Sequence, residues 1–441
     1  MTNPDLHQRV HQIIADEPVV DMHTHLYPPA FGTPNPGRNG PADPNGLHLW
    51  GVDELLTYHY LIAEVYRVVP ATELPYDTFW AMSKTQQADH IWKHLFLGRT
   101  PLSEATRGVL TTLAQLGLDP NEKNLNNHRK WFAEQDINQY IDLVMQKSTV
   151  RRITMTNNVF DPNERTRWLA DPAVGSDPRF APVLRFDKLL TDWPAAAQTL
   201  TELGYPAAPT PDHNSLDQAR RFLHDWIKRM KPIYCAVSLP PTFRYGTPDA
   251  NPATTRVLEE VVLPVCRDHD LPFAMMIGTV MRINPALRDA GDMLGKADAA
   301  SVARLCAAFP DNRFLITMLS RESQHELCVA ARKFGNLKLF GCWWFLNNPS
   351  IITEMTTERF ELLGSTFIPQ HSDARILDQL LYKWSHSKRL IADVLAAQYQ
   401  LIEDTGYTIS DPQVRADVTR LLSGNFLDTL APDHRANLAA S

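Results

Sequence analysis

The chain of 441 residues is 44% hydrophobic and 21% charged, with a formal net charge of −7, so it is long enough to bury a large core. The acidic balance and the lack of a basic cluster argue against a nucleic-acid-binding protein. No apolar run reaches the roughly 18 residues that a membrane span needs, and residues 1–18 contain no apolar signal-peptide core. The scattered cysteines have no metal-ligand spacing and predict reduced thiols in a cytoplasmic protein; they are Cys235, Cys266, Cys306, Cys328 and Cys342.

Short apolar runs alternate with longer stretches of helical spacing along most of the chain. Clear helical patterns occupy 217–230 and 254–269. Continuous apolar strands that alternate with helices predict a parallel sheet, and about eight such units predict a distorted TIM-like (β/α)₈ barrel of the α/β class. A doubly wound open sheet is the alternative, but no Gly-x-Gly-x-x-Gly motif follows the first strand. The expected strands span 19–23, 151–157, 181–186, 233–239, 272–278, 313–319, 337–344 and 364–373.

Residues 45–150 do not follow this alternation, because they carry many aromatic residues and helix formers but few strand signals. We interpret them as a mostly helical insertion after the first strand that covers the mouth of the barrel. The chain 1–441 is then a single metal-dependent barrel domain with this one large insertion.

The first strand runs into "VVDMHTHLYPP" (19–29), which holds two histidines one residue apart. In a strand, residues i and i+2 point to the same side, so His23 and His25 present both imidazoles to one point. At the carboxyl end of a barrel strand that point is the active-site face. Two neutral imidazoles there suit a divalent transition metal, with zinc expected first. Asp21, on the same side, is expected to orient one of the imidazoles.

A third metal ligand is expected to be an anion from another strand. The segment "QHSDARIL" (370–377) ends the last expected strand, which places Asp373 at the same mouth. A carboxylate is an ordinary zinc ligand. Arg375 follows Asp373 at i+2 and is expected to point the same way. A helix cap is the alternative interpretation of Asp373.

These motifs resemble those of the uronate isomerase (glucuronate isomerase) family of the amidohydrolase superfamily. Family members carry an Asp-x-His-x-His-Leu motif at the end of strand one, here 21–26, and an Asp-x-Arg pair at the end of strand eight, here 373–375. Further similar segments follow in family order: "YHYLIAEVYR" with His59 and Tyr60, "HIWKHLFLGR" (90–99), "PVLRFDK" with Arg185 and Asp187, "GCWWFLNN" with Trp343 and Trp344, and "LLSGNF" (421–426).

The resemblance implies an aldose–ketose isomerase that interconverts a hexuronate, of the D-glucuronate or D-galacturonate type, and its keto-uronate, of the fructuronate or tagaturonate type, through an enediol. One divalent metal ion, bound by His23, His25 and Asp373, would polarise the carbonyl or hold a hydroxyl. Arg375 would stabilise the developing negative oxygen. Asp373, Tyr60 or a metal-bound water remain open as the base. The substrate is a small sugar acid, and we expect a homo-oligomer.

The substrate carboxylate calls for a guanidinium fork, and Arg185 is the first candidate. His59 and Tyr60 would cap the substrate from the insertion, and Trp343 and Trp344 would form the pocket wall.

The chain departs from the family pattern at several positions. Met276 stands where the family has a histidine, Ala374 stands where a serine is usual, and the Asp-His pair of strand five is missing from 236–246. The enzymatic alternative is therefore a metal-dependent hydrolase of the same superfamily, acting on an acidic ester, amide or lactone. The alternative outside enzymes is a non-catalytic barrel that binds sugar acids.

Overall fold

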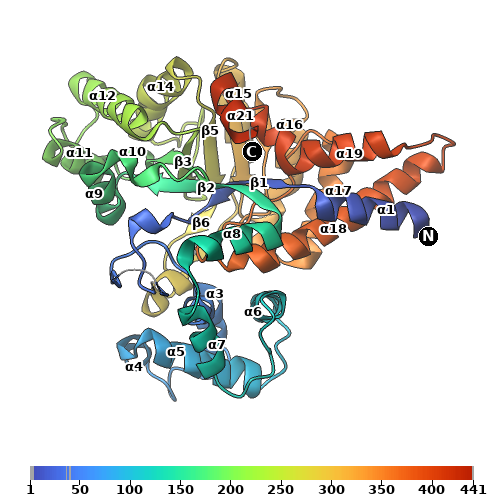
Figure 1. Ribbon diagram of the computed structural model, residues 1–441. Coiled ribbons are helices and arrows are strands. Elements are labelled where there is room, and N and C mark those ends of the chain that lie inside the picture. Colours follow the sequence, from blue (N-terminus) through green and yellow to red (C-terminus); the bar gives the residue numbers. More distant parts are fainter. Residues whose placement is uncertain (1–3, 36, 39–40, 440–441) are drawn as a thin grey trace.

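The computed structural model describes residues 4–35, 37–38 and 41–439. Its centre is a sheet of seven parallel strands whose spatial order follows the chain, with only the β6–β7 hairpin set apart (Figure 1). Most residues of the strands are buried on both faces, as expected for a sheet that helices surround. They are β1 (Val19–Thr24), β2 (Val150–Asn158), β3 (Phe180–Arg185), β4 (Cys235–Leu239), β5 (Phe273–Ile277), β8 (Phe314–Met318) and β9 (Leu337–Leu339).

The eighth strand is reduced to one bridge, between Phe340 and Ile368. Pro369 follows it and has no N–H for a ladder. Side chains replace the missing ladder bonds: Gln370 accepts from the backbone N–H of Cys342. The chain then reaches β1, where the N–H of Asp373 donates to the carbonyl of His23 over 3.1 Å. The ring therefore closes between β9 and β1, which confirms the distorted (β/α)₈ barrel, although 364–373 is not a regular strand.

Amphipathic helices pack around the barrel. In α12 (His213–Met230), buried apolar residues recur at helical spacing from Leu216 to Met230. The other helices of this layer are α1 (Pro4–Asp16), α9 (Pro162–Ala170), α10 (Asp187–Thr191), α11 (Trp193–Glu202), α13 (Pro252–Val257), α14 (Leu263–Asp268), α15 (Ala299–Ala308), α16 (Gln324–Ala331), α17 (Pro349–Leu363), α18 (Gln379–Glu403), α19 (Asp411–Thr419), α20 (Asn425–Leu427) and α21 (Pro432–Ala439). Short π-helical turns η4 (Leu258–Val262) and η8 (Arg420–Gly424) join neighbouring helices, and η3 (Pro172–Gly175), η6 (Arg321–Ser323) and η7 (Trp344–Leu346) are 3₁₀ turns.

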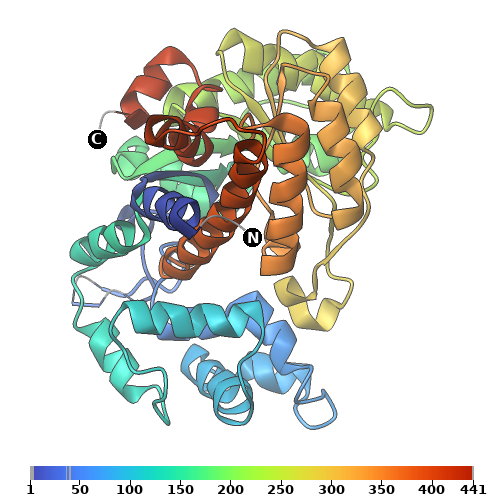
Figure 2. The same ribbon diagram turned by 90° about the vertical axis from the view of Figure 1, so that its right-hand side faces the viewer.

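Between β1 and β2 the described chain forms helices and loops. Most of these helices lie together on one side of the barrel, below the sheet in Figure 1 and again at the bottom of Figure 2. Their covering of the barrel mouth stays a prediction. They are η1 (Pro29–Phe31), α2 (Val52–Leu56), α3 (His59–Val65), α4 (Tyr76–Ala81), α5 (Lys84–Ile91), η2 (Trp92–Leu97), α6 (Glu104–Gln115), α7 (Asn126–Ala133) and α8 (Ile137–Ser148).

A small hairpin after β5 connects the barrel to this helical segment. Its strands β6 (Thr279–Val280) and β7 (Met293–Leu294) are antiparallel and enclose the 3₁₀ turn η5 (Pro285–Gly291). The indole of Trp80 donates to the carbonyl of Ala286, and the guanidinium of Arg288 lies 4.4 Å from the centre of the Trp80 ring.

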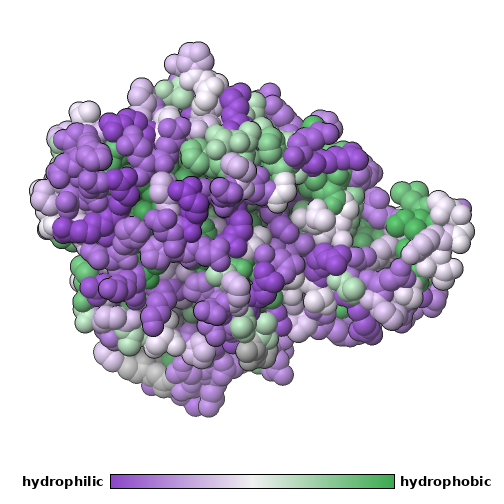
Figure 3. Space-filling view, turned by 90° about the horizontal axis from the view of Figure 1, so that it is seen from above, coloured by the Kyte–Doolittle hydropathy of each residue, from purple (hydrophilic) through white to green (hydrophobic). Residues whose placement is uncertain are grey.

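On the face seen from above, hydrophilic residues cover most of the surface and apolar residues form smaller patches (Figure 3). Within the described ranges, no helix has both the length and the apolar character needed to cross a membrane.

Candidate active site

A cavity of about 380 Å³ lies at the carboxyl ends of the barrel strands. Its walls include His23 at the end of β1, Arg185 at the end of β3 and Met276 near the end of β5. This is the face on which barrel enzymes carry their active sites. Eight of the nine residues predicted to bind the metal or the substrate or to act in catalysis line it: His23, His25, His59, Arg185, Trp343, Trp344, Asp373 and Arg375.

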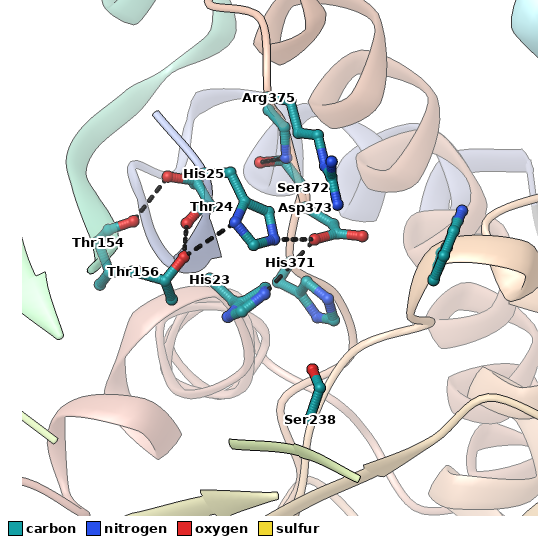
Figure 4. Close-up of polar contacts among 12 residues, drawn as sticks. His23, Thr24, His25, Thr154, Thr156, Ser238, His371, Ser372, Asp373 and Arg375 are labelled. Atoms are coloured by element: carbon teal, nitrogen blue, oxygen red, sulfur yellow. Dashed lines mark hydrogen bonds and ion pairs between the residues drawn. The ribbon is translucent and has the colours of Figure 1, made fainter. Parts of the chain in front are cut away.

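Two imidazoles and one carboxylate converge at the wall of this cavity. The Nε2 atoms of His23 and His25 each lie 3.4 Å from Oδ1 of Asp373, and the two rings are nearly perpendicular, with centroids 5.3 Å apart. Figure 4 shows both rings directed at the same carboxylate oxygen. Nitrogen and oxygen ligands within 4.8 Å of one another can together hold a metal ion.

The hydrogen bonds around the cluster also fit a metal ion. The Thr156 hydroxyl has one proton and donates it to the carbonyl of Thr24 over 2.5 Å. Its oxygen therefore accepts from Nδ1 of His25, 3.2 Å away, so Nε2 of His25 keeps its lone pair. Nε2 of His23 and Oδ1 of Asp373 are buried with no hydrogen-bond partner in the described structure. Such unpaired buried atoms are costly unless a cation satisfies them.

Electrostatics keep His25 and Asp373 in the protonation states that bind a metal. Burial lowers the pKa of His25 to about 3, so its imidazole is neutral near pH 7. Burial alone would raise the pKa of Asp373, but the adjacent imidazoles of His23 and His25 hold it well below its usual value. The cluster therefore offers the neutral nitrogen of His25 and the negative oxygen of Asp373.

Asp373 is held by an unusual backbone. Its φ is 50°, in the left-handed region that few residues other than glycine adopt, and such outliers cluster at functional sites. Asp21 fixes the same segment: its carboxylate accepts from the N–H of Ser372 and from the indole of Trp384. The structure therefore corrects one expectation, because the Asp21 carboxylate binds these two groups rather than an imidazole.

Arg185 lines the cavity, but a neighbouring carboxylate already engages it. Its Nε and Nη2 donate to Asp187 over 2.7–3.0 Å, and Nη2 also donates to Ser238. Burial works against its charge, but Asp187 more than offsets this and raises the pKa of Arg185. Its Nη1 forms no hydrogen bond within the described part of the chain, whereas Nη2 already has two acceptors.

Of the remaining predicted residues, Arg375 and His59 line the cavity and Tyr60 does not. Arg375 is half-buried and its guanidinium extends toward Asp373 (Figure 4). The indole of Trp344 donates to Nε2 of His59 over 3.1 Å, which fixes the proton of His59 on Nδ1. Burial holds the pKa of His59 well below its usual value. Tyr60 does not line the cavity; its ring packs against His59 and its hydroxyl is buried without a partner in the described structure.

One residue of this region was missed in the sequence. His371 is buried with both ring nitrogens unpaired in the described structure, and its ring lies 5.3 Å from that of His23. Gly341, at φ 65°, makes room for it, because a Cβ there would lie 1.7 Å from Nδ1 of His371. The sequence did contain one signal for His371: it lies two residues before Asp373, the spacing at which strand residues point to the same side. Met276 also lines the cavity, at the position where a family histidine was expected.

Several solved structures resemble this chain over nearly its whole length. A uronate isomerase from Bacillus halodurans is 47% identical, with 96% of both chains covered and a TM-score of 0.89. A uronate isomerase from Thermotoga maritima (14% identity, 98% of both chains, TM-score 0.74) and a glucuronate isomerase from Caulobacter crescentus (14%, 95% of this chain and 92% of the other, TM-score 0.70) share the fold. A scan against protein-family models and a search of curated proteins gave no match.

Proposed function

This chain belongs to the uronate isomerase family, and we propose that it interconverts a hexuronate and the corresponding keto-uronate. The observation that carries the proposal is the convergence of His23, His25 and Asp373 beside Arg375, in one cavity at the mouth of the barrel. The cavity volume of about 380 Å³ suits a small polar ligand. No observation favours hydrolysis over isomerisation.

A metal ion bound there would supply Lewis-acid polarisation of the sugar carbonyl or a neighbouring hydroxyl. We propose one ion, with zinc first, held by His23, His25 and Asp373. The donor set supports a divalent metal of the zinc type, because imidazole and carboxylate are ligands that zinc accepts. The homo-oligomeric state and the cytoplasmic location stay predictions.

Two arginines divide the negative charges of the reaction in this proposal. Arg185 would bind the substrate carboxylate through Nη1, while Asp187 and Ser238 hold the rest of the guanidinium in place. Arg375 stabilises the oxygen that becomes negative when the enediol forms. Trp343 and Trp344 form an apolar wall that limits water around the reacting carbons.

The proton moves between C2 and C1 of the sugar. Of the candidate bases, Tyr60 does not line the cavity, which leaves the Asp373 carboxylate and a water molecule. His59 donates rather than accepts, since Trp344 occupies the lone pair of its Nε2. We therefore propose that His59 binds a substrate oxygen through Nδ1 and that Asp373 is the base contributed by the chain.

Isomerisation and proton exchange can be tested together by NMR. D-glucuronate and D-galacturonate are incubated with metal-replete protein in D₂O, and the keto-uronate and the loss of the C2 proton signal are followed. D-glucose serves as the uncharged control substrate. Asp373→Asn should remove the activity, by at least about 10³-fold when both metal binding and proton transfer are lost. Formation of an acid and an alcohol or amine from an ester or amide, with no ketose from either uronate, would favour the hydrolase instead.

A further inference from the structure

A second cluster of metal-binding side chains lies away from the cavity, between α1 and α18. Nε2 of His7 and Nε2 of His11 lie 3.1 and 2.8 Å from the same atom, Oδ1 of Asp393. The imidazole centroids are 4.2 Å apart and the planes differ by 31°. All three ligand atoms lie within 4.8 Å of one another, and none of the three residues lines the catalytic cavity.

We propose that His7, His11 and Asp393 form a binding site for one divalent transition-metal ion, with Zn²⁺ as the best fit. The two histidines are four residues apart on one helix, a spacing that puts both imidazoles on one face. Ligands at about 2.0–2.2 Å from zinc in tetrahedral directions lie roughly 3.3–3.5 Å apart, so the observed separations need only small side-chain shifts. Water completes the coordination.

The exposure of the cluster agrees with a site that an ion can enter. The side chains of His7, His11 and Asp393 are 45%, 27% and 42% exposed. The competing explanation is a purely hydrogen-bonded cluster, in which both imidazoles donate N–H to one carboxylate oxygen. The two explanations can be told apart by experiment. The metal site requires the negative charge of Asp393 together with free lone pairs on both imidazoles, whereas the hydrogen-bonded cluster requires neither the charge nor the lone pairs.

Occupancy of this site would join two distant parts of the sequence. α1 packs along α18 (Figure 1), and Asp393 is 386 residues from His7. An ion bound only by the folded chain stabilises it by mass action. The N-terminal helix would then be fastened to the barrel by the metal as well as by its apolar face.

The test is a Zn²⁺ titration of metal-stripped full-length chains, read as bound ions per chain and as the shift in melting temperature. Wild type should bind about two ions, and His25→Ala, which removes a ligand of the cavity, about one. His25→Ala/His11→Ala should bind none tightly. The matched control is His25→Ala/His213→Ala, because His213 also faces an aspartate, Asp217, at i+4 on an exposed helix; it should keep the remaining ion.

Asp393→Asn separates the two explanations without relying on an alanine variant. Asparagine keeps an oxygen that accepts from both imidazoles, but it lacks the charge that holds the ion. In the His25→Ala background it should keep the melting temperature of the metal-free protein and lose the Zn²⁺-dependent rise. Equal Zn²⁺ binding in the Asp393→Asn, His11→Ala and control chains would overturn the proposal. That outcome would leave the proposed isomerase untouched, since the cavity ligands are tested by His25→Ala alone.

Discussion

Thr156 accepts a hydrogen bond from His25 because its own proton is already donated to the carbonyl of Thr24. These two hydrogen bonds of Thr156, on β2, keep the proton of His25 on Nδ1, so the lone pair of Nε2 faces Asp373. The Thr156 hydroxyl is not itself a metal ligand, but it fixes the tautomer of His25, which is one.

Thr156→Val should weaken metal binding while leaving the ligands themselves in place. Without the acceptor, His25 loses the partner that fixes its tautomer and ring orientation, and loss of such a partner costs about 10–100-fold in metal affinity. Competition with a chelator measures this. Thr317→Val is the control, because Thr317 is also a buried strand threonine and its hydroxyl has no partner in the described structure. Equal metal affinities in the two variants would mean that the hydrogen bond between Thr156 and His25 does not affect metal binding.

Gly341→Ala is predicted to disturb the site by displacing His371. The added Cβ would lie 1.7 Å from Nδ1 of His371, so the ring or the backbone must move. Gly364→Ala is a matched control, since Gly364 also has positive φ, 59°, but no atom lies within 4 Å of its new Cβ. The control should lose about 1–3 kcal/mol from its strained backbone, and Gly341→Ala at least about 1–3 kcal/mol more from overpacking. Urea unfolding and isomerase rates report both effects, and comparable losses would show that His371 adapts freely.

The first strand and its two histidines were predictable because both depend on local spacing. An i, i+2 pair in a strand points one way, and "VVDMHTH" shows that period directly. Tyr60 shows the opposite case. It neighbours His59 on helix α3, where successive side chains diverge by about 100°, so the pair lacks the shared direction of an i, i+2 pair in a strand.

The parts of the site that could not be predicted depend on contacts between distant segments. Nothing in 364–373 indicates that side chains of Asp21 and Gln370 would replace ladder bonds and reduce the eighth strand to one bridge. The sequence predicted that the guanidinium of Arg185 is available to bind the substrate carboxylate. In the structure, Asp187, two residues later, already binds two of its nitrogens. Thr279 and Asp292 enter the cavity from the β6–β7 hairpin, which has no apolar period to reveal it.

The raised pKa of Glu164 predicts that the stability of the folded chain depends on pH. Burial raises its pKa to about 8, so the folded chain binds this proton more tightly than the unfolded chain does. Its contribution is therefore fully present below about pH 4.5 and is lost as the pH rises toward 8. Wild type should lose on the order of 1–3 kcal/mol of unfolding free energy from this group between pH 5 and 8.

Glu164→Gln should flatten that part of the curve, because glutamine is neutral throughout. Chemical denaturation at several pH values gives the difference between the two chains. The control is Glu202→Gln, an exposed residue that, within the described residues, accepts only from Gln198. A wild-type-minus-variant difference that is constant from pH 5 to 8 would show that Glu164 is ionised in the folded chain.

Arg185→Lys is predicted to weaken binding of uronates. A lysine cannot bind Asp187 through two nitrogens and a substrate carboxylate at the same time, because it lacks the planar fork. The loss should be about 2–3 kcal/mol, the scale of a hydrogen bond to a charged group. It should appear as a higher KM for D-glucuronate and D-galacturonate, measured by steady-state kinetics. The matching neutral aldoses, which lack the carboxylate, should bind poorly to both proteins.

A second arginine in the chain separates substrate binding from stability. Arg179 binds Asp177 through Nε and Nη2 in the same bidentate way as Arg185 binds Asp187, but it does not line the cavity. Arg179→Lys therefore loses an equivalent ion pair, so it should lower the melting temperature without changing KM. If both lysine variants raise KM equally, or if Arg185→Lys affects charged and neutral sugars alike, Arg185 supports the fold and Arg375 is the remaining cavity arginine for the carboxylate.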